Sequence, residues 1–130
     1  GLEVVVHPDL VELDFGTWEN LTADEIAERY PEEWSVVYVE GVDRPRGGTG
    51  ETAEAAAVRM ASALRQIADE HPGERVAVVS HGGAIRAFVG SLVGVGHAER
   101  HRFVLPTNTS VSHVRIGEES VIVDYNLGAV

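Results

Sequence analysis

The sequence of 130 residues contains no cysteine, few basic residues and no long hydrophobic run. The absence of cysteine excludes disulfides, thiolate metal sites and a cysteine nucleophile. Ten Lys+Arg against 21 Asp+Glu give a formal net charge of -11, which disfavours nucleic acid and anionic membranes as partners. No apolar run approaches the roughly 20 residues of a transmembrane helix, and no signal-peptide pattern opens the sequence. We therefore expect a cytoplasmic protein without nucleic-acid or membrane partners.

The remaining composition is typical of a folded globular chain, with 44% hydrophobic and 24% charged residues. Thr22 and Glu25 have the spacing of a capping box, which predicts the start of a helix. Apolar spacing and turn residues predict, in order, a strand at 4–6, a helix from 22 to the proline at 31, a loop at 44–50, a helix at 52–70, a strand at 75–80, a helix at 84–93 and a hairpin of 110–116 with 121–125.

This order of elements predicts the α/β fold class. The continuous apolar run at 76–79 suits a strand that is buried on both faces of a parallel sheet. The many alanines of 52–70 suit a helix that packs closely against such a sheet. We predict a three-layer α/β/α sandwich with a largely parallel sheet that is incomplete at its N-terminal end.

Residues 76–88, VAVVSHGGAIRAF, form the sharpest motif. A buried strand ends, His81 and two glycines follow, and a helix begins. Ligands of open α/β sheets bind beyond the carboxyl ends of the strands, where a helix start offers free N–H groups to an anion. His81 at such a place can hold a phosphoryl group, attack it or transfer protons, whereas a packed histidine in a tight turn is the alternative.

Residues 10–22, LVELDFGTWENLT, carry Glu12 and Asp14 just before a glycine turn. In an extended segment both carboxylates point to the same side. A carboxyl group beside a bound phosphate faces like charge, which favours its protonated form and lets it protonate a leaving group. Two solvated loop acids are the alternative.

These segments, together with PRGGTGET at 45–52 and NTS at 108–110, resemble the histidine phosphatases in their order and spacing. This family includes the cofactor-dependent phosphoglycerate mutases and many broad-specificity phosphatases. The resemblance implies a phosphohistidine mechanism without metal or organic cofactor. It implies that Glu12 protonates the leaving oxygen, that His81 holds the transferring phosphoryl group, and that the backbone N–H of Gly82 also contacts phosphate.

The family's first motif, an apolar strand followed by Arg-His-Gly, does not occur in the sequence, and neither does a second phosphate-binding arginine early in the family's pattern. We therefore expect residues 1–130 to be the C-terminal portion of a single histidine-phosphatase-like domain, inactive alone. As partners we expect a second copy of the chain, in a homodimer, or the missing N-terminal segment. The expected function is hydrolysis of a small-molecule phosphomonoester; a non-catalytic binding module and a phosphoglycerate-type mutase remain alternatives.

Three arginines could substitute for the missing phosphate ligands. Arg86 lies five residues after His81, and Arg44 and Arg46 lie in the glycine-rich loop. We expect all three to be surface residues.

Other candidates have simpler interpretations. His97 and His101 have the i, i+4 spacing of a helical zinc site, but no zincin-type glutamate follows His97, so we expect no metal. Ser80 next to His81 is not expected to form a nucleophilic pair, because adjacent strand residues point to opposite faces. Trp18 and Trp34 are expected to pack in the core.

Overall fold

The computed structural model describes residues 1–128, and most of its regular structure is helical. The α-helices are α1 (Ala23–Arg29), α2 (Pro31–Trp34), α3 (Ala53–Glu70) and α4 (Gly82–Ser91). The shorter helical turns are η1 (Pro8–Leu10), η2 (Gly16–Trp18), η3 (Ser35–Val39), η4 (Arg46–Gly48) and η5 (His97–Arg102). The strands β1 (Val111–Arg115) and β2 (Val121–Leu127) form an antiparallel hairpin, in which Arg115 faces Val121.

Capping side chains place the helix starts where the sequence predicts them. The Thr22 hydroxyl accepts the N–H of Glu25 at 3.3 Å, and the Glu25 carboxylate accepts the N–H of Thr22 at 2.8 Å, which confirms the capping box. Thr52 caps α3 through the N–H of Ala55. Pro31 ends α1 as expected, and it then begins α2, where its missing N–H is not needed.

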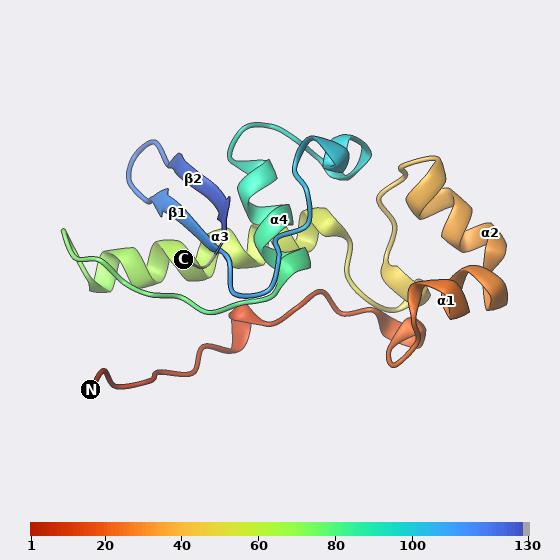
Figure 1. The fold of residues 1–130 in the computed structure, drawn as a ribbon, viewed down its shortest axis with the longest axis horizontal. Helices are drawn as coiled ribbons and strands as arrows, with labels where there is room; N and C mark the ends of the chain where they lie inside the picture. Colours follow the sequence, from red (N-terminus) through yellow and green to blue (C-terminus); the bar gives the residue numbers. More distant parts are fainter. Residues whose placement is uncertain (129–130) are drawn as a thin grey trace.

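The prediction of a three-layer sandwich with a parallel sheet is wrong for the described part of the chain. The hairpin of β1 and β2 is the one sheet within residues 1–128. Residues 4–6 and 75–80 form no strand and run as coil along the lower side of Figure 1. An apolar run favours a strand only where a second strand can complete its hydrogen bonds. No segment of residues 1–128 pairs with these two, and the Val79 side chain is 90% exposed.

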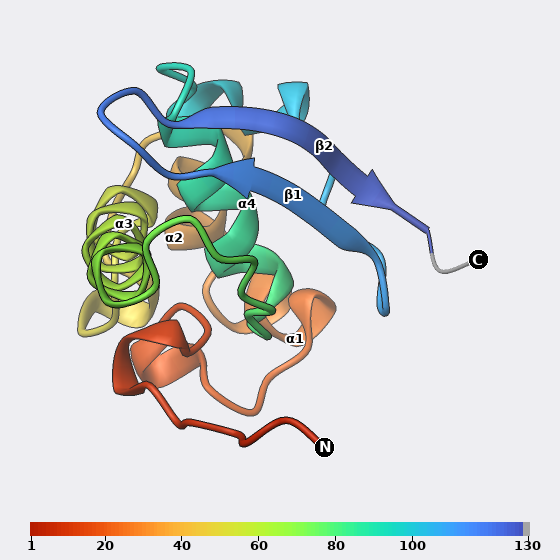
Figure 2. The ribbon, with the colours of Figure 1, turned by 90° about the vertical axis from the view of Figure 1, so that its left-hand side faces the viewer.

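The main core lies where α3 packs against α4 (Figure 1). Ala56 and Met60 of α3 meet Ala84, Phe88 and Val89 of α4, which are all buried. Small alanine side chains let the two helices approach closely. Figure 2 shows the hairpin lying over α4 on the side opposite the N-terminal segment. The hairpin contributes Val114, Ile116, Ile122 and Tyr125 to this core.

A second cluster lies at the other end of the molecule, around α1 and α2. Its buried members are Trp18, Ile26 and Val37, and aromatic side chains surround them. The Trp18 side chain is 2% exposed and belongs to the core as predicted, whereas Trp34 is half-buried and packs against the same cluster. A helix long and apolar enough to cross a membrane does not occur among the described residues.

Candidate active site at the start of α4

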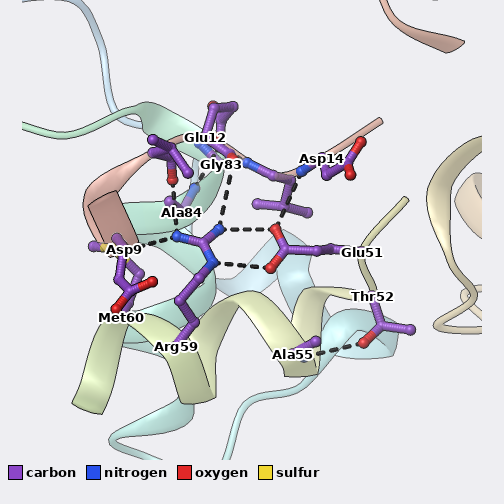
Figure 3. A network of polar contacts seen from close by, with 12 residues as sticks. Asp9, Glu12, Asp14, Glu51, Thr52, Ala55, Arg59, Met60, Gly83 and Ala84 are labelled. Atoms are coloured by element: carbon purple, nitrogen blue, oxygen red, sulfur yellow. Dashed lines mark hydrogen bonds and ion pairs between the residues drawn. The ribbon is translucent and has the colours of Figure 1, made fainter. Parts of the chain in front are cut away.

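An ion pair between Arg59 of α3 and Glu51, which precedes that helix, fixes the segment that carries Glu12 (Figure 3). The Arg59 guanidinium donates from Nε and Nη2 to the two carboxylate oxygens of Glu51, both at 2.8 Å. Its Nη1 donates to the backbone carbonyls of Asp9 and Val11 at 2.6 and 3.1 Å. The Arg59 hydrogen bond lowers the pKa of Glu51 from its ordinary value. The fork-like guanidinium thus ties the loop to the helix in one orientation.

The Glu12 carboxylate lies at the N-terminus of α4. Its oxygens accept the backbone N–H groups of Gly83 at 3.0 Å and Ala84 at 2.8 Å. These N–H groups have no partner inside the helix, and the positive end of the helix dipole favours an acidic group here. A Cβ atom at Gly83 would lie 2.6 Å from Glu12 Oε1, so this approach requires glycine.

His81 directly precedes α4 at its N-cap position, with extended backbone angles of -113° and 154°. Its side chain is exposed and makes no hydrogen bond to another residue of the range 1–128. The neighbouring Gly82 begins the helix and packs near Leu105. The structure therefore brings the predicted residues Glu12, His81 and Gly82 to one helix start.

The Asp14 side chain does not lie with Glu12 and His81 at the start of α4. Its carboxylate accepts the N–H of Gly16 at 2.8 Å, in a local turn. Ser80 is also held by a hydrogen bond, because its hydroxyl donates to the Leu10 carbonyl at 2.8 Å. Both side chains therefore stabilise the loops beside the helix start.

The surface assignment holds for Arg44, which is exposed, but it is wrong for Arg46. The Arg46 side chain is 2% exposed and donates to Asp43 Oδ1 at 2.9 Å. Asp43 also accepts the N–H groups of Ala53 and Glu54 at the start of α3. Burial opposes the charge of Asp43, but these three hydrogen bonds outweigh it and lower its pKa. The glycine-rich loop thus carries an internal ion pair, which local sequence patterns do not reveal.

His97 completes this buried network. Arg46 Nη2 lies 3.2 Å from His97 Nδ1, and His97 Nε2 lies 2.7 Å from the Val37 carbonyl. A guanidinium can only donate, so Nδ1 accepts and the proton of the neutral ring is on Nε2. Burial lowers the pKa of His97, which favours this neutral form.

The i, i+4 spacing of His97 and His101 does not align them. Both lie in η5, a 3-10 helix, whose three residues per turn separate positions four apart. His97 is buried and His101 is exposed. Within residues 1–128 no group of three or more His, Cys, Asp or Glu side chains could hold a metal ion.

Arg86 is the second arginine whose surface assignment is wrong. It is half-buried and lines a cavity of about 660 Å³ beside α4. Gly83, Arg46 and Arg100 line the same cavity, which therefore begins next to the helix start that holds Glu12. Arg100 lies in η5, a turn that the sequence patterns did not predict.

Comparisons with known proteins show the family to which this chain belongs. The family model described as histidine phosphatase superfamily (branch 1) matches residues 1–127. A metal-independent phosphoserine phosphatase of Arabidopsis thaliana is 34% identical over 125 residues, covering 86% of this chain and 52% of that protein. A probable phosphoglycerate mutase of Photorhabdus laumondii is 35% identical over 101 residues, covering 77% of this chain and 46% of that protein. The chain thus spans about half the length of these relatives.

Solved structures show the same arrangement of the backbone. A mycobacterial glucosyl-3-phosphoglycerate phosphatase superimposes with a TM-score of 0.81 and 24% identity, covering 98% of this chain and 65% of that chain. YhfR of Bacillus stearothermophilus gives 0.79 and 21% identity, covering 95% and 61%. Since the family model matches nearly the whole sequence, the chain belongs to branch 1 of the histidine phosphatase superfamily.

Proposed function

We propose that the native protein is a phosphomonoester hydrolase that acts through a phosphohistidine intermediate, and that this chain supplies Glu12 and His81. One observation carries the proposal. The Glu12 carboxylate, 3.0 Å from the Gly83 nitrogen, lies at the same helix start as His81. A proton donor and a phosphate-binding histidine have to meet at one point for this chemistry, and they come from segments about 70 residues apart in the sequence.

The start of α4 suits a phosphoryl group. Glu12 occupies the N–H groups of Gly83 and Ala84, whereas the N–H of Gly82 and the positive end of the α4 dipole can attract an anion. The exposed His81 ring can donate a further hydrogen bond to a phosphoryl oxygen.

The reaction has two steps. A nucleophilic histidine, expected from an Arg-His-Gly motif that residues 1–130 do not contain, attacks phosphorus, and the bond to the ester oxygen breaks. The Glu12 proton passes to that oxygen as the alcohol leaves. In the second step water attacks the phosphohistidine, and Glu12 accepts a proton from it while phosphate is released.

The similar proteins are named as phosphatases and as mutases of small phosphorylated molecules. These names support a small-molecule phosphomonoester as substrate. We favour hydrolysis over mutase activity, because residues 1–130 lack the insertions and basic residues expected for a phosphoglycerate mutase site. Hydrolysis needs only water as the second acceptor.

The test compares leaving groups in the native protein, expressed from its complete coding sequence. Glu12→Gln removes the proton donor but keeps the side-chain size. Turnover of an alkyl phosphate, whose alkoxide must be protonated, should fall by about 100-fold or more, within the usual range for general acid catalysis. Turnover of p-nitrophenyl phosphate should fall much less, because p-nitrophenolate leaves without a proton.

Glu28→Gln on the exposed face of α1 is the matched control and should leave both rates unchanged. His81→Ala should abolish release of phosphate from both substrates, with His113→Ala as its control on the exposed side of β1. Equal losses for the two leaving groups in Glu12→Gln would remove Glu12 as the acid. An inactive native protein would support the binding-module alternative instead.

A further inference from the structure

Arg59 of α3 holds the backbone that leads into Glu12 (Figure 3). Its Nη1 donates to the carbonyls of Asp9 and Val11 at 2.6 and 3.1 Å, and its Nη2 lies 3.5 Å from the Glu12 carbonyl oxygen. Irregular backbone has to find partners for its carbonyl groups outside helices and sheets. Here one side chain binds three carbonyls within four consecutive residues, so the path of this segment depends on a single guanidinium group.

Glu51 holds the backbone on the other side of Glu12. Its carboxylate accepts the N–H of Asp14 at 3.1 Å, and its own N–H donates to the Asp14 carbonyl at 2.8 Å. A Cβ atom at Gly50 would clash with that carbonyl, so the close approach of the two loops requires glycine. The Arg59 guanidinium binds the same Glu51 carboxylate, which joins the two anchors into one unit.

A third anchor joins this segment to His81. The Ser80 hydroxyl donates to the Leu10 carbonyl at 2.8 Å, and Ser80 directly precedes His81. The Glu12 carboxylate binds the N–H of Gly83, two residues after His81, at 3.0 Å. Hydrogen bonds on both sides of Glu12 and on both sides of His81 therefore set how these two side chains lie relative to each other.

Burial distinguishes this network from an ordinary surface ion pair. The Arg59 and Glu51 side chains are 17% and 23% exposed, so water competes for their hydrogen bonds only in part. Nε, Nη1 and Nη2 of Arg59 all donate to protein atoms. A planar guanidinium can hold a carboxylate and a row of carbonyls at once, which a lysine ammonium on its flexible stem cannot do. The geometry thus suits a residue that fixes a position in addition to neutralising a charge.

General acid catalysis makes strict demands on where the Glu12 carboxyl group lies. The proton donor must come within about 2.6–3.2 Å of the leaving oxygen. A misplacement of about 1 Å, caused by a change far from the reacting atoms, can lower the rate by about 100-fold. Since the glutamate side chain is long and flexible, its carboxyl group is placed well only where its backbone is fixed.

We propose that Arg59 is a positioning residue for the proposed reaction. Together with Glu51 it fixes residues 9–14, so that the Glu12 carboxyl group reaches the leaving oxygen. The hydrogen bonds of Arg59 go to Glu51 and to this segment, so it acts through Glu12. The inference rests on the proposed function, which makes Glu12 the proton donor.

The test measures the leaving-group preference of the native protein, expressed from its complete coding sequence. Arg59→Met should lower kcat for an alkyl phosphate by about tenfold or more, whereas kcat for p-nitrophenyl phosphate and both KM values should stay within about threefold. A purely structural role would lower both rates by the same factor, because both would follow the amount of folded protein. Circular dichroism at the assay temperature measures that amount.

Three further variants show how Arg59 acts. Arg59→Lys keeps a charge beside Glu51, and with it the fold, but not the planar fork, so it should show the same preference at a smaller size. In a Glu12→Gln background, Arg59→Met should change the ratio of the two rates no further. Arg65→Met is the matched control and should leave both rates unchanged, since Arg65 is exposed on the same helix and donates to the Gly117 carbonyl.

Amide hydrogen exchange tests the inference without the reaction. Glu12 binds the N–H groups of Gly83 and Ala84, so Arg59→Met should raise their exchange rates by about fivefold or more, as expected when a hydrogen bond is lost. Nuclear magnetic resonance on the native protein measures these rates, with Arg65→Met again as the control. Unchanged exchange at both amides would overturn the positioning role.

The two measurements separate this inference from the proposed function. If Glu12→Gln shows no leaving-group preference, the proposed function fails, and the exchange rates alone decide whether Arg59 positions Glu12. If Glu12→Gln shows the preference but Arg59→Met lowers both rates equally, the proposed function stands and the positioning role is overturned.

Discussion

Glu12 Oε2 accepts the backbone N–H of Gly83 at 3.0 Å, across 71 positions of sequence. This contact joins the two segments that carry the candidate chemistry, and it depends on the missing side chain of Gly83. It also gives Glu12 a structural role as the cap of α4, in addition to any role in catalysis. Substitutions at the two positions therefore have separable effects on stability and activity.

Gly83→Ala should lower the free energy of unfolding by about 1–2 kcal/mol, the usual cost of a lost helix cap. The new Cβ would lie 2.6 Å from Glu12 Oε1, so the carboxylate must leave the helix start. Urea unfolding measures the change. Gly96→Ala is the control, because a Cβ there meets no atom within 4 Å. In a Glu12→Ala background the Gly83→Ala cost should largely disappear; an undiminished cost would mean that Gly83 acts through another contact.

Arg59→Met should destabilise the fold by about 1–3 kcal/mol, because it leaves Glu51 without its partner. The side chains of this pair are 17% and 23% exposed, so water screens the pair only in part. Arg29→Met, at an ion pair that is 58% and 44% exposed, should cost less than about 1 kcal/mol. Comparable losses for the two variants would contradict the anchoring role of Arg59.

The same pair predicts an acid dependence. Arg59 lowers the folded-state pKa of Glu51 below its ordinary 4.5. In this case the unfolded chain binds the proton first, so stability is present above about pH 4.5 and is lost as the pH falls through the lower folded value. Unfolding free energies measured between pH 6 and pH 3 should therefore fall less steeply in Glu51→Gln than in the parent chain. Parallel curves would exclude Glu51 as a source of the acid dependence.

Local signals in the sequence predicted the helices well. Thr22 and Thr52 caps, Pro31 and the apolar spacing of 52–70 act over a few residues, so their patterns are readable without tertiary contacts. The hairpin was also predicted, because its two strands are joined by a short turn. The prediction of strands at 4–6 and 75–80 was wrong, because β-branched composition does not show whether another strand is present to pair with them.

Some residues of the candidate site were predicted from local motifs, whereas contacts between distant segments were not. The SHGG motif and the acidic segment pointed to Glu12, His81 and Gly82, and the structure brings them together. Sequence patterns missed the pairs Arg59–Glu51 and Arg46–His97, which are 8 and 51 positions apart. Their contacts depend on how α3 and η5 pack, and neither spacing corresponds to a known motif.

His97 predicts a second pH effect, near neutrality. Burial lowers its folded-state pKa from 6.5, so the unfolded chain binds a proton on this ring more tightly than the folded chain does. Stability should therefore fall as the pH drops below about 6.5 and level off below the folded value. His97→Gln, which can still donate to the Val37 carbonyl, should remove this slope between pH 8 and pH 5. His113→Gln, at an exposed position, should keep it, and a slope retained in His97→Gln would assign it elsewhere.

Asp43 and Arg46 should show strong energetic coupling. Asp43→Asn leaves the Arg46 guanidinium buried at 2% exposure without its carboxylate, which typically costs about 3–5 kcal/mol. Arg46→Met in the Asp43→Asn background removes that unpaired charge, so the double variant should lose clearly less than the sum of the two single losses. Denaturant unfolding of all four chains measures the coupling, with near-ultraviolet circular dichroism to confirm that each chain folds. Additive losses would show that Asp43 acts only by capping α3, through the N–H groups of Ala53 and Glu54, and that Arg46 is held by its other contacts.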